Sequence, residues 1–173
     1  MALGGAERKQ LFDRALREFG DALWRLTGGY ARSEADRKDL HQDILIAIWQ
    51  ALPRFGGKSS LRTFVYRIAH NRGVSHRAYE GRREHGSIES MVLPDPAPGP
   101  EQRIEVARRR ALLQGAVRSL APSLRQPIML HLDGLSNPDI AEIVGISEGN
   151  VAVRLTRARQ AIQKALSTRD EDD

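Results

Sequence analysis

Four prolines at alternate positions, Pro94, Pro96, Pro98 and Pro100, constrain this chain most, because proline breaks a helix and cannot join a sheet ladder. On both sides of them apolar residues recur at the three- and four-residue steps of amphipathic helices, and no stretch of useful length alternates as a strand does. We therefore predict an all-α protein in which two small helical domains are joined by an extended linker.

The expected division follows from this composition. We predict an N-terminal domain of three to four helices over residues 6–84, a Pro-rich acidic linker over 85–104, a helix-turn-helix domain over 105–168 and an acidic tail over 169–173. A fully extended linker of that length spans roughly 65 Å. The two domains can therefore hold separate sites.

Charge is divided along the chain in the same way. Residues 54–86 carry eight Lys and Arg against two acidic residues, and residues 106–169 carry ten against four, so the net charge of each block is +6. Between them, residues 87–105 carry one Arg against four acidic residues, a net charge of −3. Two basic blocks around an acidic spacer favour a polyanion held at two places, with nucleic acid as the first candidate.

Several classes of function are disfavoured. There is no cysteine, and the five histidines lack the i, i+4 spacing of a zinc motif, so we expect no metal site and no cofactor. We find no phosphate-binding glycine loop or nucleophile motif and expect no enzymatic activity. The longest uncharged apolar-rich stretch, residues 44–53, has ten residues against the roughly 20 that span a bilayer. With no signal-peptide pattern either, we expect a cytoplasmic protein.

The N-terminal half predicts three helices. The first stops at Gly28-Gly29, the second runs from a Ser33 cap to Pro53, and the third runs from near Ser60 to about Arg83. Their inward stripes are apolar, with Phe64 and Trp49 expected in the core; the members are Phe12, Leu16, Phe19, Leu23 and Leu26, then Leu40, Ile44, Ile48 and Leu52, then Leu61, Phe64, Val65 and Ile68.

The C-terminal half predicts a helix over 106–120 with Leu113 inside. A short helix follows over about 125–133, with Pro127 in its first turn and Gly134 past its end. Next come two helices with the spacing of a helix-turn-helix: residues 137–144, a Gly145-Ile146-Ser147 turn in which Ser147 caps the next helix, and residues 148 to about 166.

The last helix has two contrasting faces. Val151, Leu155, Ala158 and Ile162 form the inward stripe, and amide and guanidinium groups face outward. Such groups suit a major groove, where Arg pairs with guanine or phosphates and Asn pairs with adenine; the alternative is a solvated basic face. The DNA-binding residues expected here are Ser147, Asn150, Val153, Arg154, Arg157 and Lys164. Among them we expect Arg157 to read a base and Arg154 to hold phosphates.

Two signatures resemble those of the extracytoplasmic-function (ECF) group of bacterial sigma factors in the sigma-70 family. One is Asp39-Leu-His-Gln-Asp-Ile-Leu-Ile-Ala-Ile-Trp49 with Phe64-Val-Tyr-Arg-Ile-Ala-His-Asn71, within about residues 8–83. The other begins with Arg125-Gln-Pro-Ile, continues through the helix-turn-helix and ends with Arg154-Leu-Thr-Arg-Ala-Arg. The chain departs from many members at Ala152 and Val153, where a cation and a small polar residue are usual.

The resemblance implies a promoter-recognition factor for bacterial RNA polymerase with sigma region 2 and region 4 domains. Its partners would be the clamp helices of the largest polymerase subunit, the flap of the second largest, promoter DNA with minus-10 and minus-35 elements, and an anti-sigma factor. It implies no membrane insertion. By resemblance, the linker threads near the polymerase active centre, where its negative charge mimics RNA.

For the first domain, the resemblance implies that one helix face binds polymerase and that another binds the minus-10 DNA. The polymerase-docking face of the second helix would comprise Asp39, Gln42, Asp43 and Ile46. Without the resemblance, these residues would be interpreted as an ordinary solvated helix face. The minus-10 surface would capture a base flipped from the nontemplate strand, where an aromatic ring stacks bases and cations follow phosphates. It would comprise Lys58, Ser59, Arg62, Tyr66, Arg67, His70, Asn71 and Arg77.

Two other functions remain open from the residues alone. A stand-alone helix-turn-helix regulator would need a ligand pocket or phosphoacceptor in its first half, and co-purification with polymerase would distinguish it. A helical adaptor that binds acidic proteins would not show DNA affinity with a steep salt dependence.

Overall fold

The structure is a computed structural model that describes residues 4–80, 112–113 and 115–170. All regular secondary structure in these ranges is helical, and the chain divides into two compact units. The predicted all-α class is therefore confirmed. The linker expected over 85–104 and both of its boundaries lie outside the described residues, as do the last three residues of the acidic tail.

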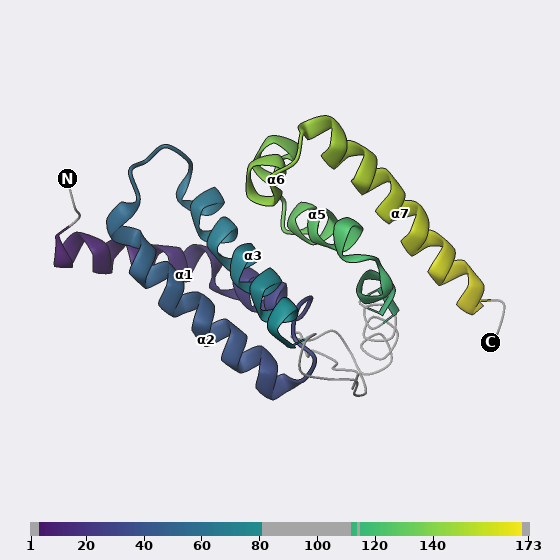
Figure 1. Cartoon of the computed structure of the whole chain (residues 1–173), viewed down its shortest axis with the longest axis horizontal. Helices are drawn as coiled ribbons and strands as arrows, with labels where there is room; N and C mark the ends of the chain where they lie inside the picture. The colour runs from purple at the N-terminus through teal and green to yellow at the C-terminus, as the bar shows by residue number, and fades with distance from the viewer. Residues whose placement is uncertain (1–3, 81–111, 114, 171–173) are drawn as a thin grey trace, which may run out of the picture. The chain divides into compact units, whose positions relative to one another are not determined.

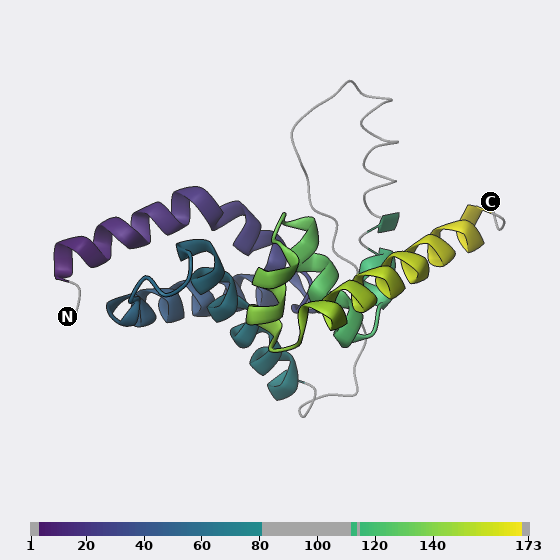
Figure 2. The same ribbon diagram turned by 90° about the horizontal axis from the view of Figure 1, so that it is seen from above.

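The N-terminal unit contains three long helices, α1 (Gly5–Thr27), α2 (Glu34–Ala51) and α3 (Leu61–Glu80), with the short 3-10 helix η1 (Leu52–Arg54) directly after α2. Each long helix packs against the other two. Figure 1 shows α2 and α3 side by side, and Figure 2 shows α1 along one side of that pair. Three amphipathic helices thus enclose one small core.

The N-terminal helices begin and end close to the predicted residues. The first helix stops at Gly28, and the Ser33 hydroxyl caps the second by accepting the backbone N–H of Asp36 at 3.2 Å. The Ser60 hydroxyl likewise accepts the N–H of Thr63 at 3.0 Å at the start of α3. Side-chain oxygens thereby satisfy N–H groups that the first helical turn leaves free.

The inward stripe of α2 is confirmed, since Leu40, Ile44, Ile48 and Leu52 are at most 1% exposed. In α1 the fully buried members of the predicted stripe are Leu23 and Leu26, while Phe12, Leu16 and Phe19 are half-buried. Helix α3 departs more from the prediction. Its buried face includes Thr63 and Tyr66, and the side chains of Phe64 and Ile68 are only half-buried.

An arginine from α1 closes the end of α2. Pro53 has no N–H, so the Trp49 carbonyl cannot receive the helical bond from the residue four positions later. The Nε and Nη2 atoms of Arg8 donate to that oxygen at 2.9 and 2.6 Å, and the guanidinium lies 3.9 Å from the Trp49 ring centroid. One side chain therefore replaces a missing backbone donor and covers an aromatic face.

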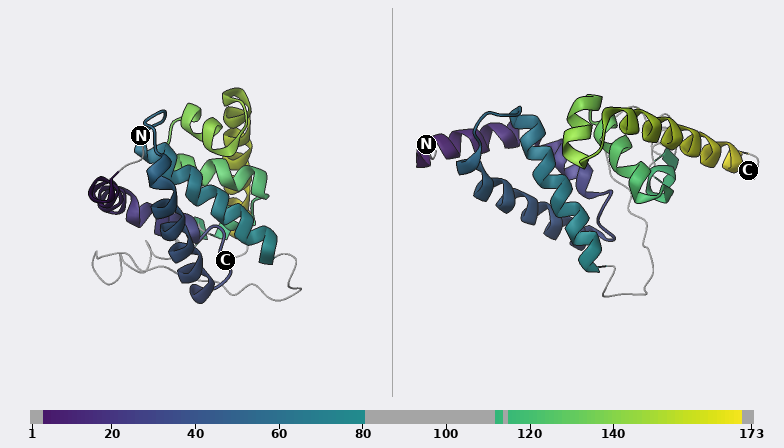
Figure 3. Two further views of the ribbon diagram at one scale, coloured as in Figure 1. Left: turned by 60° about the vertical axis from the view of Figure 1, so that its left-hand side comes forward. Right: turned by 45° about the horizontal axis from the view of Figure 1, so that its top comes forward.

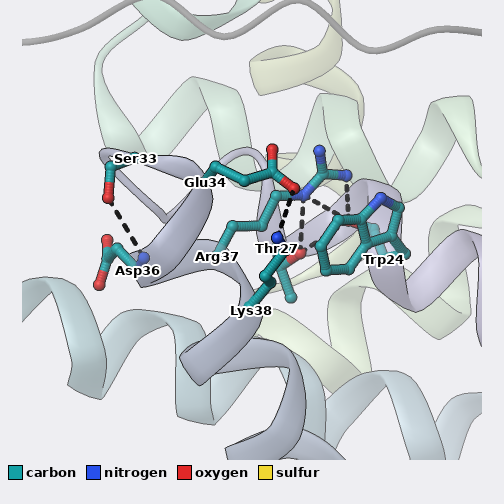
Figure 4. Close-up of polar contacts among 7 residues, drawn as sticks. All are labelled: Trp24, Thr27, Ser33, Glu34, Asp36, Arg37 and Lys38. Atoms are coloured by element: carbon teal, nitrogen blue, oxygen red, sulfur yellow. Dashed lines mark hydrogen bonds and ion pairs between the residues drawn. The ribbon is translucent and has the colours of Figure 1, made fainter.

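A second arginine, Arg37 of α2, is buried and serves the end of α1 (Figure 4). Its Nε donates to the carbonyl of Trp24 and to the hydroxyl of Thr27, at 3.2 Å each, and its guanidinium lies 4.0 Å from the Trp24 ring centroid. Burial lowers the pKa of Arg37 from its ordinary value, and the nearby carboxylate of Glu34 opposes this shift. Arginine nevertheless stays charged, so these hydrogen bonds persist at all ordinary pH values.

The C-terminal unit is built on α5 (Pro122–Leu132) packed against α7 (Glu148–Asp170). The expectation that Pro127 lies in the first turn of α5 is wrong. The helix starts earlier than predicted, with Pro122 in its first turn, where a proline is favoured. Pro127 therefore lies inside the helix and leaves the Ser123 carbonyl without a helical N–H donor.

The helix predicted over 106–120 is described from residue 112 onward. Ala116 and Leu120 are buried, but Leu113, which we expected inside, is 40% exposed. Among the described residues of this segment, Leu113 therefore lies off the buried face.

The predicted helix-turn-helix is confirmed. Helix α6 (Asn137–Val144) and α7 flank Gly145, whose φ of 75° lies in the left-handed region that favours glycine. The Ser147 hydroxyl accepts the backbone N–H of Asn150 at 3.3 Å and so caps α7. Of the inward stripe on α7, Val151, Leu155 and Ala158 are at most 2% exposed and Ile162 is half-buried.

Candidate nucleic-acid interface

Helix α7 is the long C-terminal helix, yellow-green to yellow in Figure 3, and it begins directly after the helix-turn-helix turn. Its outward face carries most of the residues expected to meet DNA. Ser147, Asn150, Arg157 and Lys164 are exposed, and the apolar Val153 is 48% exposed. The turn and the buried stripe hold this face away from the core, as predicted. It therefore offers an amide, an aliphatic surface and cations along one helix.

Arg154 differs from its neighbours on this face because it is half-buried and held within its own unit. Its Nε donates to the Oδ1 atom of Asn150 at 3.2 Å, and its Nη1 lies 3.4 Å from the carbonyl oxygen of Ser123. That carbonyl is the one left free by Pro127. We did not predict these contacts, although the proline four residues after Ser123 was a usable signal.

The loop before α3 has the backbone freedom and polar groups that we expected for a base-binding loop. Gly57 has a φ of 69°, Lys58 is exposed and Ser59 is half-buried. Asn71 lies ten residues into α3 and is exposed, which places it roughly 15 Å along the helix from its first turn. Arg77 is also exposed, whereas Arg62 and Arg67 are half-buried.

Two of the expected minus-10 residues, Tyr66 and His70, lie in the core and not on the exposed surface where we expected them. Tyr66 is 1% exposed and its ring packs edge-on against Phe19, with centroids 6.3 Å apart. His70 is 5% exposed, and its Nδ1 lies 2.9 Å from the Tyr30 hydroxyl. Because α3 packs against both α1 and α2, its buried face is wider than the apolar stripe, and it includes these polar rings.

Burial also settles the charge of His70. It lowers the pKa of His70 from 6.5 to about 4, because the cationic form would lose its hydration. The neutral ring shares a hydrogen bond with the Tyr30 hydroxyl through Nδ1. His70 therefore supplies neither a cation nor an accessible ring for a nucleic acid. The exposed aromatic side chain of α3 is Tyr79, at 54%.

The acidic face of α2 is placed as predicted. Asp39, Gln42 and Asp43 are exposed, and Ile46 is 46% exposed, while the stripe on the opposite side of the helix is buried. A carboxylate and amide surface with one exposed aliphatic side chain repels phosphate and can bind a protein with basic and apolar groups. This face is therefore distinct in chemistry from that of α7.

Comparison with known proteins agrees with both halves of the chain. The family model described as "Sigma-70 region 2" matches residues 15–83, and that described as "Sigma-70, region 4" matches residues 110–162. In the described residues, no helix is at once long enough and apolar enough to cross a membrane.

Curated relatives and a solved structure cover most of the chain. The ECF RNA polymerase sigma-E factor of Escherichia coli K12 is 34% identical over 137 residues, which are 73% of this chain and 72% of the relative. The RNA polymerase sigma-H factor of Pseudomonas aeruginosa is 29% identical over 168 residues, 91% and 87% of the two chains. The sigma factor RpoE from Bartonella quintana, solved in complex with the anti-sigma factor NepR, has a TM-score of 0.73 at 25% identity and covers 90% of this chain and 96% of that one. This chain therefore belongs to the ECF group of sigma-70 family RNA polymerase sigma factors.

Proposed function

We propose that this sigma factor directs core RNA polymerase to promoters by using α7 for the minus-35 element, α3 with its preceding loop for the minus-10 element, and α2 for docking. The observation that carries the proposal is the exposed face of α7 directly after the helix-turn-helix turn, with Asn150, Val153 and Arg157 accessible together. Transcription from promoter DNA by reconstituted holoenzyme tests it.

In the minus-35 complex, the N-terminal part of α7 enters the major groove. Arg157 reads a guanine, since its guanidinium is exposed and can pair with O6 and N7. Val153 covers a thymine methyl, and the Ser147 hydroxyl and the Lys164 ammonium hold phosphates, which position the helix without reading sequence. Asn150 and Arg154 belong to the same face.

In the minus-10 complex, Asn71 and the loop residues Lys58 and Ser59 contact the nontemplate strand. The exposed Arg77 and the half-buried Arg62 and Arg67 follow its phosphates. Extruding a base costs a few kcal/mol, which a polar pocket offsets. Asn71 lies roughly 15 Å along α3 from the start of the helix. One base can therefore contact both Asn71 and the loop only if the loop folds back along the helix.

The docking face of α2 binds the clamp helices of the largest polymerase subunit through Asp39, Gln42, Asp43 and Ile46. Its carboxylates steer association with basic groups, and Ile46 adds apolar contact. The C-terminal domain binds the flap of the second largest subunit. The protein has no catalytic part in RNA synthesis, which the polymerase performs in the cytoplasm.

An anti-sigma factor is the remaining partner that we propose. The Bartonella quintana relative was solved in complex with one, and that structure is similar to this chain over 90% of its length. Binding of such a partner would compete with polymerase, so polymerase affinity measured with and without a candidate partner tests the regulation.

A further inference from the structure

The contact between Arg154 and Asn150 determines which atom of the amide lies on which side. The Nε–H of Arg154 can only donate, so the Asn150 atom that lies 3.2 Å from it is the acceptor Oδ1. Residue 154 is one turn further along the same helix face, which turns the oxygen along the helix axis. Arg154 thus occupies one lone pair of the oxygen, whereas the contact uses neither of the two N–H donors of the amide nitrogen.

The other end of the arginine is held as well. Its Nη1 lies 3.4 Å from the Ser123 carbonyl, which Pro127 deprives of a helical donor. Moving the guanidinium onto a DNA phosphate would break both contacts. Arg157 is exposed and lies three residues further along α7, so it can reach DNA without breaking these two contacts. The two arginines of this face therefore differ in their freedom to reach DNA.

We propose that Arg154 is a positioning residue that presents Asn150 to the major groove as a hydrogen-bond donor, so that the base read by Asn150 is guanine and not adenine. This inference rests on the proposed minus-35 function. An Asn that reads adenine must accept from N6 and donate to N7 through both amide atoms. Guanine instead presents two acceptors, N7 and O6, whereas thymine presents the single acceptor O4 beside a methyl group.

The test is selection of duplexes from a randomised library by holoenzyme that is reconstituted from core RNA polymerase and the full chain. Asn150→Ala identifies the base pair that Asn150 reads, because preference is lost there alone. At that pair the wild type is expected to favour guanine over adenine by roughly 5- to 150-fold. Arg154→Met keeps an apolar stem and removes the donors, so it should abolish or reverse that ratio, and adding Asn150→Ala to it should change nothing further at that pair.

Arg157→Ala is the matched control, since it removes an arginine from the same face. It should change preference at a different base pair and leave the guanine-to-adenine ratio at the Asn150 pair intact. Unchanged helicity and thermal midpoint in Arg154→Met would show that the loss is not a folding defect.

The opposing outcomes are distinct. A uniform loss of affinity for all duplexes in Arg154→Met, with a salt slope lower by about one, would make Arg154 a phosphate contact and overturn the inference. Adenine or thymine as the wild-type preference at the Asn150 pair would overturn it too. A wild type without preference at any position would instead overturn the proposed minus-35 function itself.

Discussion

The guanidinium of Arg8 donates two hydrogen bonds to the carbonyl oxygen of Trp49, the carbonyl that Pro53 leaves without a helical partner. Arg154 and the Ser123 carbonyl repeat this relationship in the second unit, where Pro127 is the proline. In both cases an arginine from another helix satisfies a backbone oxygen four residues before a proline. Some of the arginines that give this chain its basic character therefore stabilise helix ends.

Replacing Arg8 should destabilise the N-terminal unit. Arg8→Met removes charged donors to Trp49 and a cation over its ring, so we expect a loss of about 1 to 3 kcal/mol in the free energy of unfolding. Urea denaturation measures it. Arg14→Met is the control: Arg14 is exposed and pairs with Glu18 within one helix, and its loss should cost less than about 0.5 kcal/mol. Equal effects of the two changes would contradict the role given to Arg8.

Gly73 should not tolerate a methyl group. A Cβ at this position would lie 2.6 Å from the nearest atom of the Tyr30 ring, which packs directly against the backbone of α3. Gly73→Ala should therefore lower the thermal midpoint and reduce the free energy of unfolding by about 1 to 3 kcal/mol. Gly20→Ala in α1 meets no atom within 4 Å and should raise stability by about 0.5 to 1 kcal/mol. A stabilising Gly73→Ala would show that the Tyr30 ring can move away.

Stability should fall below neutral pH because of His70. Its pKa in the folded state is about 4 against 6.5 for an ordinary histidine, so in this window the unfolded chain binds a proton that the folded chain does not. The contribution is fully present above pH 6.5 and is lost as the pH falls toward 4. We expect the free energy of unfolding to drop by about 2 kcal/mol more between pH 7 and pH 5 in the wild type than in His70→Gln. The same pH dependence in both proteins would mean that residue 70 titrates normally.

The docking face should tolerate a change of charge without loss of folding. Asp43 is exposed, so Asp43→Arg should leave the free energy of unfolding within about 0.5 kcal/mol of wild type and weaken binding to core polymerase. Asp21→Arg, the same change at an exposed position of α1, is the control and should bind as wild type does. Equal weakening by both variants would assign the effect to net charge and not to this face.

Asn71 should act after duplex recognition. Asn71→Ala should impair open-complex formation, followed by a fluorescent base analogue at the extruded position, and leave binding to minus-35 duplex unchanged. The reason is that the two steps use different domains. Lys58→Ala is measured beside it, because the loop and Asn71 are separated along α3. A wild-type fluorescence signal in Asn71→Ala would remove this residue from the site.

The apolar spacing predicts the helices well because local signals determine where they begin and end. Ser33 and Ser147 cap the helices that we expected them to cap, α3 begins next to Ser60 as expected, and Gly145 has the left-handed conformation that the turn requires. The exposed faces of α2 and α7 follow from the same spacing, since the opposite stripes are strongly apolar.

In helix α3 the apolar spacing does not predict all of the residues that are buried. Tyr66 and His70 are polar enough to be assigned to a surface, yet a helix packed against two others buries more than its apolar stripe. Their partners, Phe19 and Tyr30, are tens of residues away in the sequence, so no local pattern indicates the contacts. The buried Arg37 went unpredicted for the same reason, since its acceptors lie at the end of another helix.

The central claim is that this chain confers promoter specificity on core RNA polymerase. The direct measurement is run-off transcription on fragments of the genome that encodes it, with core polymerase alone and with the full chain added, followed by mapping of the transcript 5′ ends. We predict new transcripts that require the chain, start downstream of two shared sequence elements and disappear with Asp43→Arg. Specific DNA binding without any new transcript, and without association with core polymerase, would contradict the claim and identify a stand-alone regulator.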